Sequence, residues 1–124
     1  MPYVTITASQ GFSAEQKKQL LEQSSAAVVQ SIGAPKASVR IMLQELPDGH
    51  YLSGDSFDEL ALMYVVDMIE GRSIELKAAL IKALSRAGSQ ATGVSESDVR
   101  VRVFDVPRTD IGLANGITAA QAGR

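Results

Sequence analysis

The second residue of the chain is a proline, and its position gives it a chemistry that internal prolines lack. A small residue follows Met1, so we expect Met1 to be removed and the mature chain to begin with the secondary amine of Pro2. Free α-amino groups titrate at about 8, and an apolar pocket or nearby cations lower the pKa of an amine by disfavouring its protonated form. Pro2 is therefore a candidate general base. The alternative is that Pro2 begins an edge strand, where a missing N–H is harmless.

Three arginines are candidates for binding an acidic substrate. Arg40 and Arg100 lie in similar segments of the two halves of the chain, and Arg72 follows Gly71 where a helix is expected to begin. A guanidinium offers a fork of donors that suits a carboxylate or an enolate oxygen. The alternative is a set of surface arginines on strands, such as Arg100 with Arg102. The residues alone leave both interpretations open.

Other residue types give weaker candidates for catalysis or for metal binding. The chain has no cysteine and a single histidine, His50, which makes a zinc cage or a Ser-His-Asp triad hard to assemble. We therefore expect no metal site, and we interpret Asp55, Asp58 and Glu59 as solvating a linker. Tyr51 could supply an aromatic wall or a hydroxyl donor, because its loop follows the strand that carries Arg40.

Composition narrows the class of protein. The chain has 124 residues, of which 45% are hydrophobic and 21% charged, and this fits one compact domain. A net charge of −2 gives no basic field for nucleic acid. No apolar run is long enough to span a membrane, and the start of the chain lacks the basic residues of a signal peptide. We expect a cytoplasmic protein with neither nucleic acid nor a membrane as its partner.

An internal duplication provides the elements that must position these residues. Shifted by 60 positions, the two halves of the chain align without a gap, as repeats 2–55 and 62–116. The identical pairs include Gly11 with Gly71, Ser13 with Ser73, Glu15 with Glu75, Lys17 with Lys77, Leu20 with Leu80, Gly33 with Gly93, Arg40 with Arg100 and Pro47 with Pro107. One register kept across a whole half indicates duplication.

Each repeat has the pattern of a strand, a helix and a second strand. The predicted strands are 2–8, 38–45, 62–69 and 98–106, and residues 47–62 form a linker. Ser13 with Gln16 has the pattern of a helix capping box, and Gly33 suits the left-handed position after a helix. The fold class is α+β, with two tandem β-α-β units forming a four-stranded mixed sheet and both helices on one face. The uncovered apolar face predicts a homo-oligomer.

The two halves are not chemically equal. Leu62 stands where the first half has Pro2, and Phe12 stands where the second half has Arg72. Each half has thus lost a different part, which fits one composite site for each pair of halves. Ordinary drift after duplication would leave a similar pattern.

Several segments together resemble the 4-oxalocrotonate tautomerase family. They are Met1-Pro2-Tyr3-Val4, Gly11-Phe12-Ser13-Ala14-Glu15-Gln16-Lys17, Ala34-Pro35, Ser38-Val39-Arg40, Gly49-His50-Tyr51, Glu70-Gly71-Arg72-Ser73 and Asp98-Val99-Arg100-Val101. The resemblance covers nearly the whole chain as two fused family subunits. It implies the tautomerase superfamily fold, assembled as a trimer equivalent to the hexamer of the short members.

The resemblance also implies roles for single residues. The N-terminal proline of the family corresponds to Pro2, the arginine after its Glu-Gly pair to Arg72, and its strand arginine to Arg40. These three are the implied catalytic residues. Arg100, which matches Arg40, and Tyr51, which matches the pocket-lining aromatic residue, are implied to bind substrate. Sites of the family combine different subunits, so the partners of Pro2 come from either half or from a neighbouring chain.

The implied reaction is a keto-enol tautomerisation of a 2-hydroxymuconate- or phenylenolpyruvate-like 2-hydroxy-enoic acid. Neutral Pro2 would take the enol proton and return a proton to carbon, while one arginine holds the carboxylate and another polarises the 2-oxygen. No metal or organic cofactor is implied. Fused relatives act as decarboxylases or as hydrating dehalogenases on small three-carbon acids, but Ser38 and Ile69 depart from their patterns. A non-catalytic ferredoxin-like binding domain is the alternative from another class.

Overall fold

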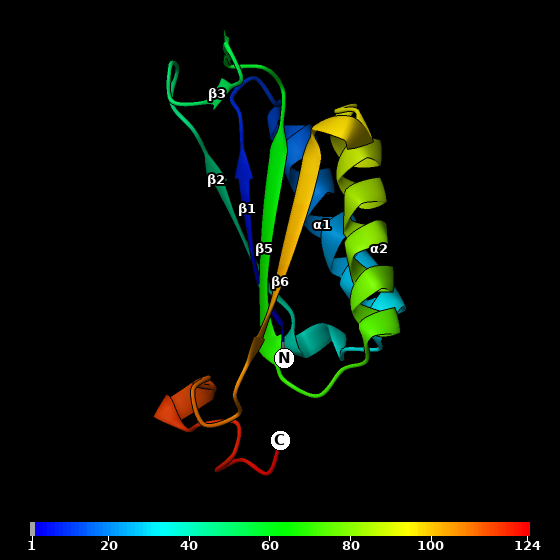
Figure 1. Cartoon of the computed structure of the whole chain (residues 1–124), viewed down its shortest axis with the longest axis vertical. Helices are drawn as coiled ribbons and strands as arrows, with labels where there is room; N and C mark the ends of the chain where they lie inside the picture. The colour runs from blue at the N-terminus through cyan, green and yellow to red at the C-terminus, as the bar shows by residue number, and fades with distance from the viewer. Residues whose placement is uncertain (1) are drawn as a thin grey trace.

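A computed structural model describes residues 2–124 of the chain, so the expected removal of Met1 concerns a residue outside the described ones. The elements in chain order are β1 (Pro2–Ala8), α1 (Ala14–Ile32), β2 (Arg40–Glu45), β3 (Leu52–Ser53), β4 (Ser56–Phe57), β5 (Leu62–Ile69), α2 (Ile74–Thr92) and β6 (Val99–Val106). The order β-α-β therefore occurs twice, with a small hairpin of β3 and β4 between the two units (Figure 1).

The main sheet has four strands in the order β2-β1-β5-β6. Within each unit the two strands are parallel, whereas β1 and β5 are antiparallel in the centre of the sheet, with Pro2 opposite Met68 and Ala8 opposite Leu62. Both helices lie on one face (Figure 1). The predicted fold class is thus confirmed. Because the central pair is antiparallel, the two units are related by an approximate twofold axis through the sheet.

The ends of the helices follow the cap residues. The Ser13 hydroxyl accepts a hydrogen bond from the backbone N–H of Gln16 at 3.1 Å, and the Gln16 side chain accepts one from the Ser13 N–H at 2.9 Å. Ser73 caps α2 in the same way through the N–H of Leu76, at 3.1 Å. Gly33, with φ of 70°, ends α1 in the left-handed conformation that favours glycine.

Two local features differ from the predictions. The second strand of each unit begins later than expected, because a 3₁₀ turn (Lys36–Ser38 and Glu96–Asp98) precedes it. The first turn is closed by a hydrogen bond from the Ser38 N–H to the Pro35 carbonyl at 2.9 Å. The predicted linker also contains the hairpin of β3 and β4, whose two-residue strands carry no readable periodicity.

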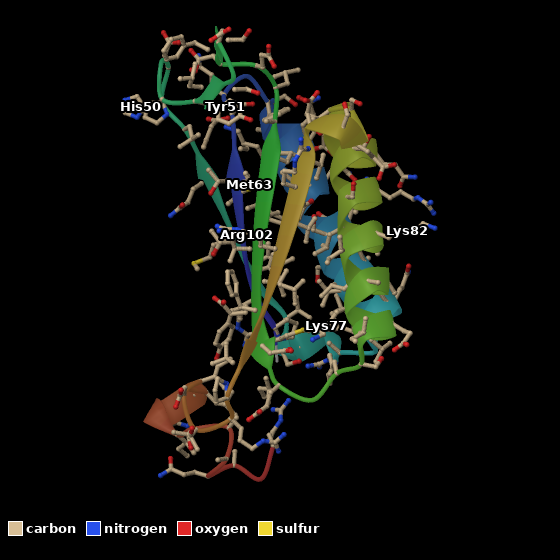
Figure 2. All side chains as sticks on the ribbon, viewed as in Figure 1. His50, Tyr51, Met63, Lys77, Lys82 and Arg102 are labelled. Carbon is tan, nitrogen blue, oxygen red and sulfur yellow. The ribbon has the colours of Figure 1, made fainter. Side chains whose placement is uncertain are left out.

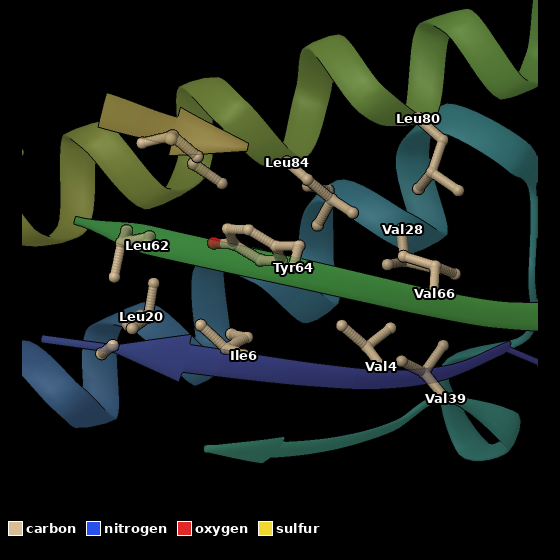
Figure 3. Close-up of a cluster of buried hydrophobic side chains, with 14 of the residues drawn as sticks. Val4, Ile6, Leu20, Val28, Val39, Leu62, Tyr64, Val66, Leu80 and Leu84 are labelled. Atoms are coloured by element: carbon tan, nitrogen blue, oxygen red, sulfur yellow. The ribbon is translucent and has the colours of Figure 1, made fainter. Parts of the chain in front are cut away.

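The core between sheet and helices is packed differently around its two central strands (Figure 3). On β5, the buried Tyr64 hydroxyl hydrogen-bonds the Ser24 hydroxyl of α1 at 2.8 Å. On α2, Gly88 lies so close that an added Cβ would be 2.8 Å from the Tyr64 hydroxyl oxygen. The residues 60 positions away from Tyr64, Gly88 and Ser24 are Val4, Val28 and Leu84, which are also buried. Tyr64 and its two small neighbours thus correspond, in the related half of the core, to three aliphatic side chains.

Replacing Tyr64 with Phe is expected to change how stability depends on pH. Burial raises the pKa of Tyr64 to about 12 from an ordinary value of 10.0, and the hydrogen bond with Ser24 offsets part of that shift. Between these values the unfolded chain releases the phenol proton and the folded chain keeps it. The free energy of unfolding of the wild type should therefore fall as pH rises from 10 towards 12, by up to ~1.4 kcal/mol per pH unit.

The measurement is urea unfolding of both proteins at pH 9 and at pH 11, at one protein concentration. At pH 9 the Tyr64→Phe variant should be less stable by about 1 kcal/mol, because the Ser24 hydroxyl loses its partner. At pH 11 the wild type has lost ~1.4 kcal/mol of stability that the variant keeps, so the difference should vanish or reverse. Parallel pH dependences in the two proteins would contradict the assignment.

The other face of the sheet is uncovered in the single chain. It exposes Met42, Met63 and Phe104, whose exposed fractions are 64%, 36% and 46%. The guanidinium of Arg102 lies over the ring of Phe104, 5.7 Å from its centre. Figure 2 shows Arg102 on this face and Lys82 of α2 on the opposite side. Within residues 2–124, neither helix is apolar enough over its length to cross a membrane.

Candidate active site

The candidate residues are divided between the two ends of the sheet. Pro2 begins β1, and Leu62, its counterpart in the second repeat, begins β5. Because β1 and β5 are antiparallel, Leu62 lies opposite Ala8 and thus at the far end from Pro2. At 3.3 Å per residue the two ends are about 20 Å apart. We call them the proline end and the Leu62 end.

Pro2, Arg40 and Arg72 lie at the proline end. Arg40 is opposite Tyr3 in the register of β1 with β2, and Arg72 follows β5, whose Met68 is opposite Pro2. Arg40 donates from Nη1 to the Ala37 carbonyl at 2.6 Å, and Arg72 donates from Nη1 to the Ile69 carbonyl at 3.5 Å. Each guanidinium is thus held near the backbone by one nitrogen, and within residues 2–124 its other N–H groups have no acceptor.

Pro2 itself is less than 2% exposed. Its surroundings are apolar, since Met68 opposite is fully buried and Ile69 beyond it is only 7% exposed. An apolar setting with nearby cations is the environment in which a free amine is held neutral. The arrangement suits a proton-accepting amine beside groups that bind an acid.

Tyr51 and Arg100 lie at the Leu62 end, away from Pro2. Arg100 is opposite Met63 in the register of β5 with β6. Figure 2 shows Tyr51 and Met63 towards the end of the sheet that carries the hairpin. Both Tyr51 and Arg100 line a pocket of about 320 Å³ there. The sequence grouped these two with Pro2, but within one chain the structure does not bring them together.

The C-terminal segment fills the corresponding place at the proline end. Ile111, the counterpart of Tyr51, is 4% exposed and packs with Ile69 and Ala119 in a second hydrophobic cluster. Tyr3 lies against this cluster and donates its hydroxyl hydrogen to the Gly112 carbonyl at 2.6 Å. The residues after β6 are therefore fixed beside the beginning of β1.

A further arginine at the proline end was missed by the sequence interpretation. Arg108 follows β6, and its Nε lies 3.6 Å from Glu70 Oε2, which also accepts the Arg108 backbone N–H at 3.0 Å. Its Nη1 donates to the Arg124 carbonyl at 3.0 Å. Its counterpart in the first half is Asp48. Arg108 could have been placed at this end from the predicted parallel pairing of β5 with β6, because that pairing brings the residues that follow the two strands to the same end of the sheet.

The acidic residues of the linker shape the loop that carries Tyr51. Asp58 accepts a hydrogen bond from the Gly49 N–H at 2.8 Å, which lowers the pKa of its carboxyl, and its own N–H donates to the Tyr51 carbonyl at 2.9 Å. Asp58 thus holds the turn as well as solvating it. His50 is exposed. Within the described part of the chain, no group of three or more His, Cys, Asp or Glu residues is placed to hold a metal ion.

Comparison with known proteins identifies the family. The family model described as "Tautomerase enzyme" matches residues 2–59 and again residues 65–119. The chain belongs to the tautomerase family. Each match falls on one β-α-β unit, so this tautomerase is of the fused 4-oxalocrotonate tautomerase type, and it is an isomerase.

Relatives of this tautomerase are known by sequence and by structure. The 2-hydroxymuconate tautomerase of Comamonas testosteroni is 44% identical over 57 residues, which are 46% of this chain and 89% of that relative. The crystal structure of Pt0534 inactivated by 2-oxo-3-pentynoate has 61% identity, a TM-score of 0.96 and coverage of 98% of this chain and 99% of that one. The Q0 fused 4-OT, a symmetric trimer, has 45% identity, a TM-score of 0.94 and the same coverage.

Proposed function

We propose that this tautomerase converts 2-hydroxy-enoic acids, such as 2-hydroxymuconate and phenylenolpyruvate, into their 2-oxo tautomers, with the amine of Pro2 as the general base after removal of Met1. The observation that carries the proposal is the grouping of Pro2, Arg40 and Arg72 at one end of the sheet. A base and two cations there match the parts that proton transfer within an enol acid requires.

In the proposed reaction, neutral Pro2 takes the proton of the 2-hydroxyl group. The electron pair moves through the conjugated system, and Pro2 returns a proton to C3 or C5, so no atom is gained or lost. One of Arg40 and Arg72 binds the carboxylate, and the other stabilises the negative charge that develops on the 2-oxygen. The buried, apolar setting of Pro2 favours the neutral amine that the first step needs.

Relatives support the class of substrate. One relative is named a 2-hydroxymuconate tautomerase, and the similar Pt0534 is inactivated by 2-oxo-3-pentynoate, which is itself a 2-oxo acid. Inactivation of Pt0534 by a 2-oxo acid supports a site for the same class of acid here. The decarboxylase and dehalogenase alternatives have no comparable support from residues at the proline end.

Arg100 and Tyr51 could contact a substrate at Pro2 only from a neighbouring protomer. The Q0 fused 4-OT is a trimer, and the uncovered face of the sheet here exposes Met42, Met63 and Phe104. We therefore include a trimer in the proposal. The cytoplasmic location expected from the sequence stays a prediction.

Ketonisation assays test the proposal directly. Protein shown by intact mass to lack Met1 is mixed with 2-hydroxymuconate and, separately, with phenylenolpyruvate, and ultraviolet absorbance follows the loss of the enol. Turnover well above the spontaneous rate is expected with at least one of the two. Absence of turnover with both by correctly processed protein would overturn the proposal.

Inactivation by 2-oxo-3-pentynoate should locate the amine. The secondary amine of Pro2 is expected to add to the alkyne, forming one N–C bond while the amine proton ends on carbon, so the adduct carries the mass of the whole reagent. Peptide mapping should find this mass on Pro2. Protein that retains a residue before Pro2 is the control, because its Pro2 nitrogen is an amide and should not react.

A further inference from the structure

The geometry points to a second ligand site at the Leu62 end: we infer that the pocket lined by Arg100 and Tyr51 binds small carboxylic acids without converting them. Its volume of about 320 Å³ lies within the range of ligand pockets, which is about 300–1,000 Å³. The inference rests on the proposed function only for the class of ligand. We call this cavity the Arg100 pocket.

The Arg100 pocket is the counterpart of the proline end under the approximate twofold axis. Its lining includes Leu62, Met63 and Arg100. Moved by 60 positions, Leu62 corresponds to Pro2, Arg100 to Arg40 and Met63 to Tyr3. The duplication therefore placed corresponding residues at the two ends of the sheet.

Among residues 2–124, the Leu62 end carries this pocket, whereas aliphatic side chains occupy two of the corresponding positions at the proline end. At the proline end, Ile69 and Leu113 pack in the second hydrophobic cluster, and their counterparts in the Arg100 pocket are the smaller Ser9 and Ser53. The two serines leave space in the Arg100 pocket that Ile69 and Leu113 fill at the proline end. The cavity is thus a consequence of specific side-chain sizes rather than of loose packing.

The lining of the pocket suits an acid with a short apolar body. Arg100 donates from Nη1 to the Val99 carbonyl at 3.4 Å and to the Ser97 carbonyl, and among residues 2–124 its Nε and Nη2 have no hydrogen-bond acceptor. Asp98 also lines the pocket but lies beyond salt-bridge distance of Arg100. The guanidinium therefore keeps donors for a carboxylate.

Hydroxyl groups and apolar side chains complete the pocket. Thr7, Tyr51 and Ser53 carry hydroxyls that, within the described residues, bond no other side chain. Leu46, Leu62 and Met63 supply the apolar wall. A ligand with a carboxylate at one end and a short unsaturated chain would match both parts.

Leu62 leaves this pocket without the amine that the proposed reaction uses. At the proline end, the corresponding residue supplies the proposed base, whereas Leu62 is an internal residue with an amide nitrogen and an aliphatic side chain. The pocket contains no histidine, lysine or cysteine among its lining residues. It can bind an acid, but it offers no amine to move the proton.

Methionine methyl groups allow the two ends to be observed separately. Met63 lines the Arg100 pocket, whereas Met68 is opposite Pro2. Protein labelled with carbon-13 at the methionine methyls is titrated with muconate, a dicarboxylate without the 2-hydroxyl, and followed by NMR. We expect the Met63 signal to shift and to saturate, also in protein whose Pro2 has first been modified with 2-oxo-3-pentynoate.

Variants on β6 show whether Arg100 holds the ligand. Arg100→Gln should weaken the binding seen at Met63 by about ten- to a hundredfold, because a charged hydrogen bond is lost. Arg102→Gln is the matched control, since Arg102 lies on the same face of the same strand but does not line the pocket, and at an oligomeric state shown to equal that of the wild type it should bind as the wild type does.

Three results would overturn the inference. They are a Met63 signal that muconate does not move, equal binding by Arg100→Gln and the wild type, and loss of the Met63 shift once Pro2 is modified. The last would mean that Arg100 completes the Pro2 site of a neighbouring protomer. Failure of the proposed function is separate, because it would appear as absent ketonisation. The same titration on Pro2→Ala protein should still move Met63.

Discussion

Protein in which the Pro2 nitrogen is an amide is expected to lose about 10²–10⁴-fold of kcat/KM for ketonisation of 2-hydroxymuconate, because a positioned general base contributes a factor of this size. An N-terminal residue that is not removed produces this change without altering any side chain of the fold. Pro2→Ala, which keeps a free but primary amine on a more flexible residue, should fall between this protein and the wild type. Initial rates by ultraviolet absorbance measure all three.

The pH profile separates loss of the base from blockage of the site. A base must be neutral to act, so kcat/KM of the wild type should rise with pH as the Pro2 amine loses its proton. The extended protein has no amine at this position, and its residual activity should lack that limb. Equal kcat/KM in the wild type, Pro2→Ala and the extended protein would show that Pro2 is not the base.

The largest change in stability is expected from Gly88→Val. A Cβ on Gly88 would lie 2.8 Å from the Tyr64 hydroxyl oxygen and 2.9 Å from Leu62 Cδ1, and the branched side chain adds further atoms there. Overpacking of this kind costs about 1–3 kcal/mol. The free energy of unfolding in urea, measured at one protein concentration, should fall by that amount despite the better helix propensity of valine over glycine.

Replacing the three residues with their counterparts from the other repeat should restore the stability lost in Gly88→Val. The triple variant with Gly88→Val, Tyr64→Val and Ser24→Leu reproduces the set Val28, Val4 and Leu84, and it should recover most of the stability. Gln90→Val is the control for a β-branched residue at an exposed position of α2, and its effect should stay within about 0.5 kcal/mol. A single Gly88→Val variant as stable as the wild type would show that the core can yield around Tyr64.

Much of the fold could be predicted because its signals are local or repeated. Ser13 and Gly33 mark the ends of a helix through backbone groups that lie within a few residues of them. The repeat at 60 positions then carries the same elements into the second half. The hairpin of β3 and β4 could not be predicted, because strands of two residues show no alternation and depend on contacts across a turn.

The candidate site was harder to predict, because it depends on how the two halves pair. The grouping of Arg100 and Tyr51 with Pro2 required knowing the relative direction of β1 and β5. Their antiparallel pairing puts the beginnings of the two repeats at opposite ends of the sheet. Nothing within either repeat encodes that direction. The same pairing brings Arg72 from the second half to Pro2.

The unequal packing around Tyr64 bears on whether the duplication could be undone. If the second repeat were separated and paired with a copy of itself, each Tyr64 would meet Leu84 in the place that Ser24 takes here, and its hydroxyl would be buried without a partner. The first repeat, paired with itself, would instead oppose Val4 to Ser24 and leave a void. Each repeat paired with its own copy should therefore be less stable than the two repeats paired with each other. The complementary interiors therefore favour pairing of the two different repeats, and this preference would remain if the connecting segment were cut.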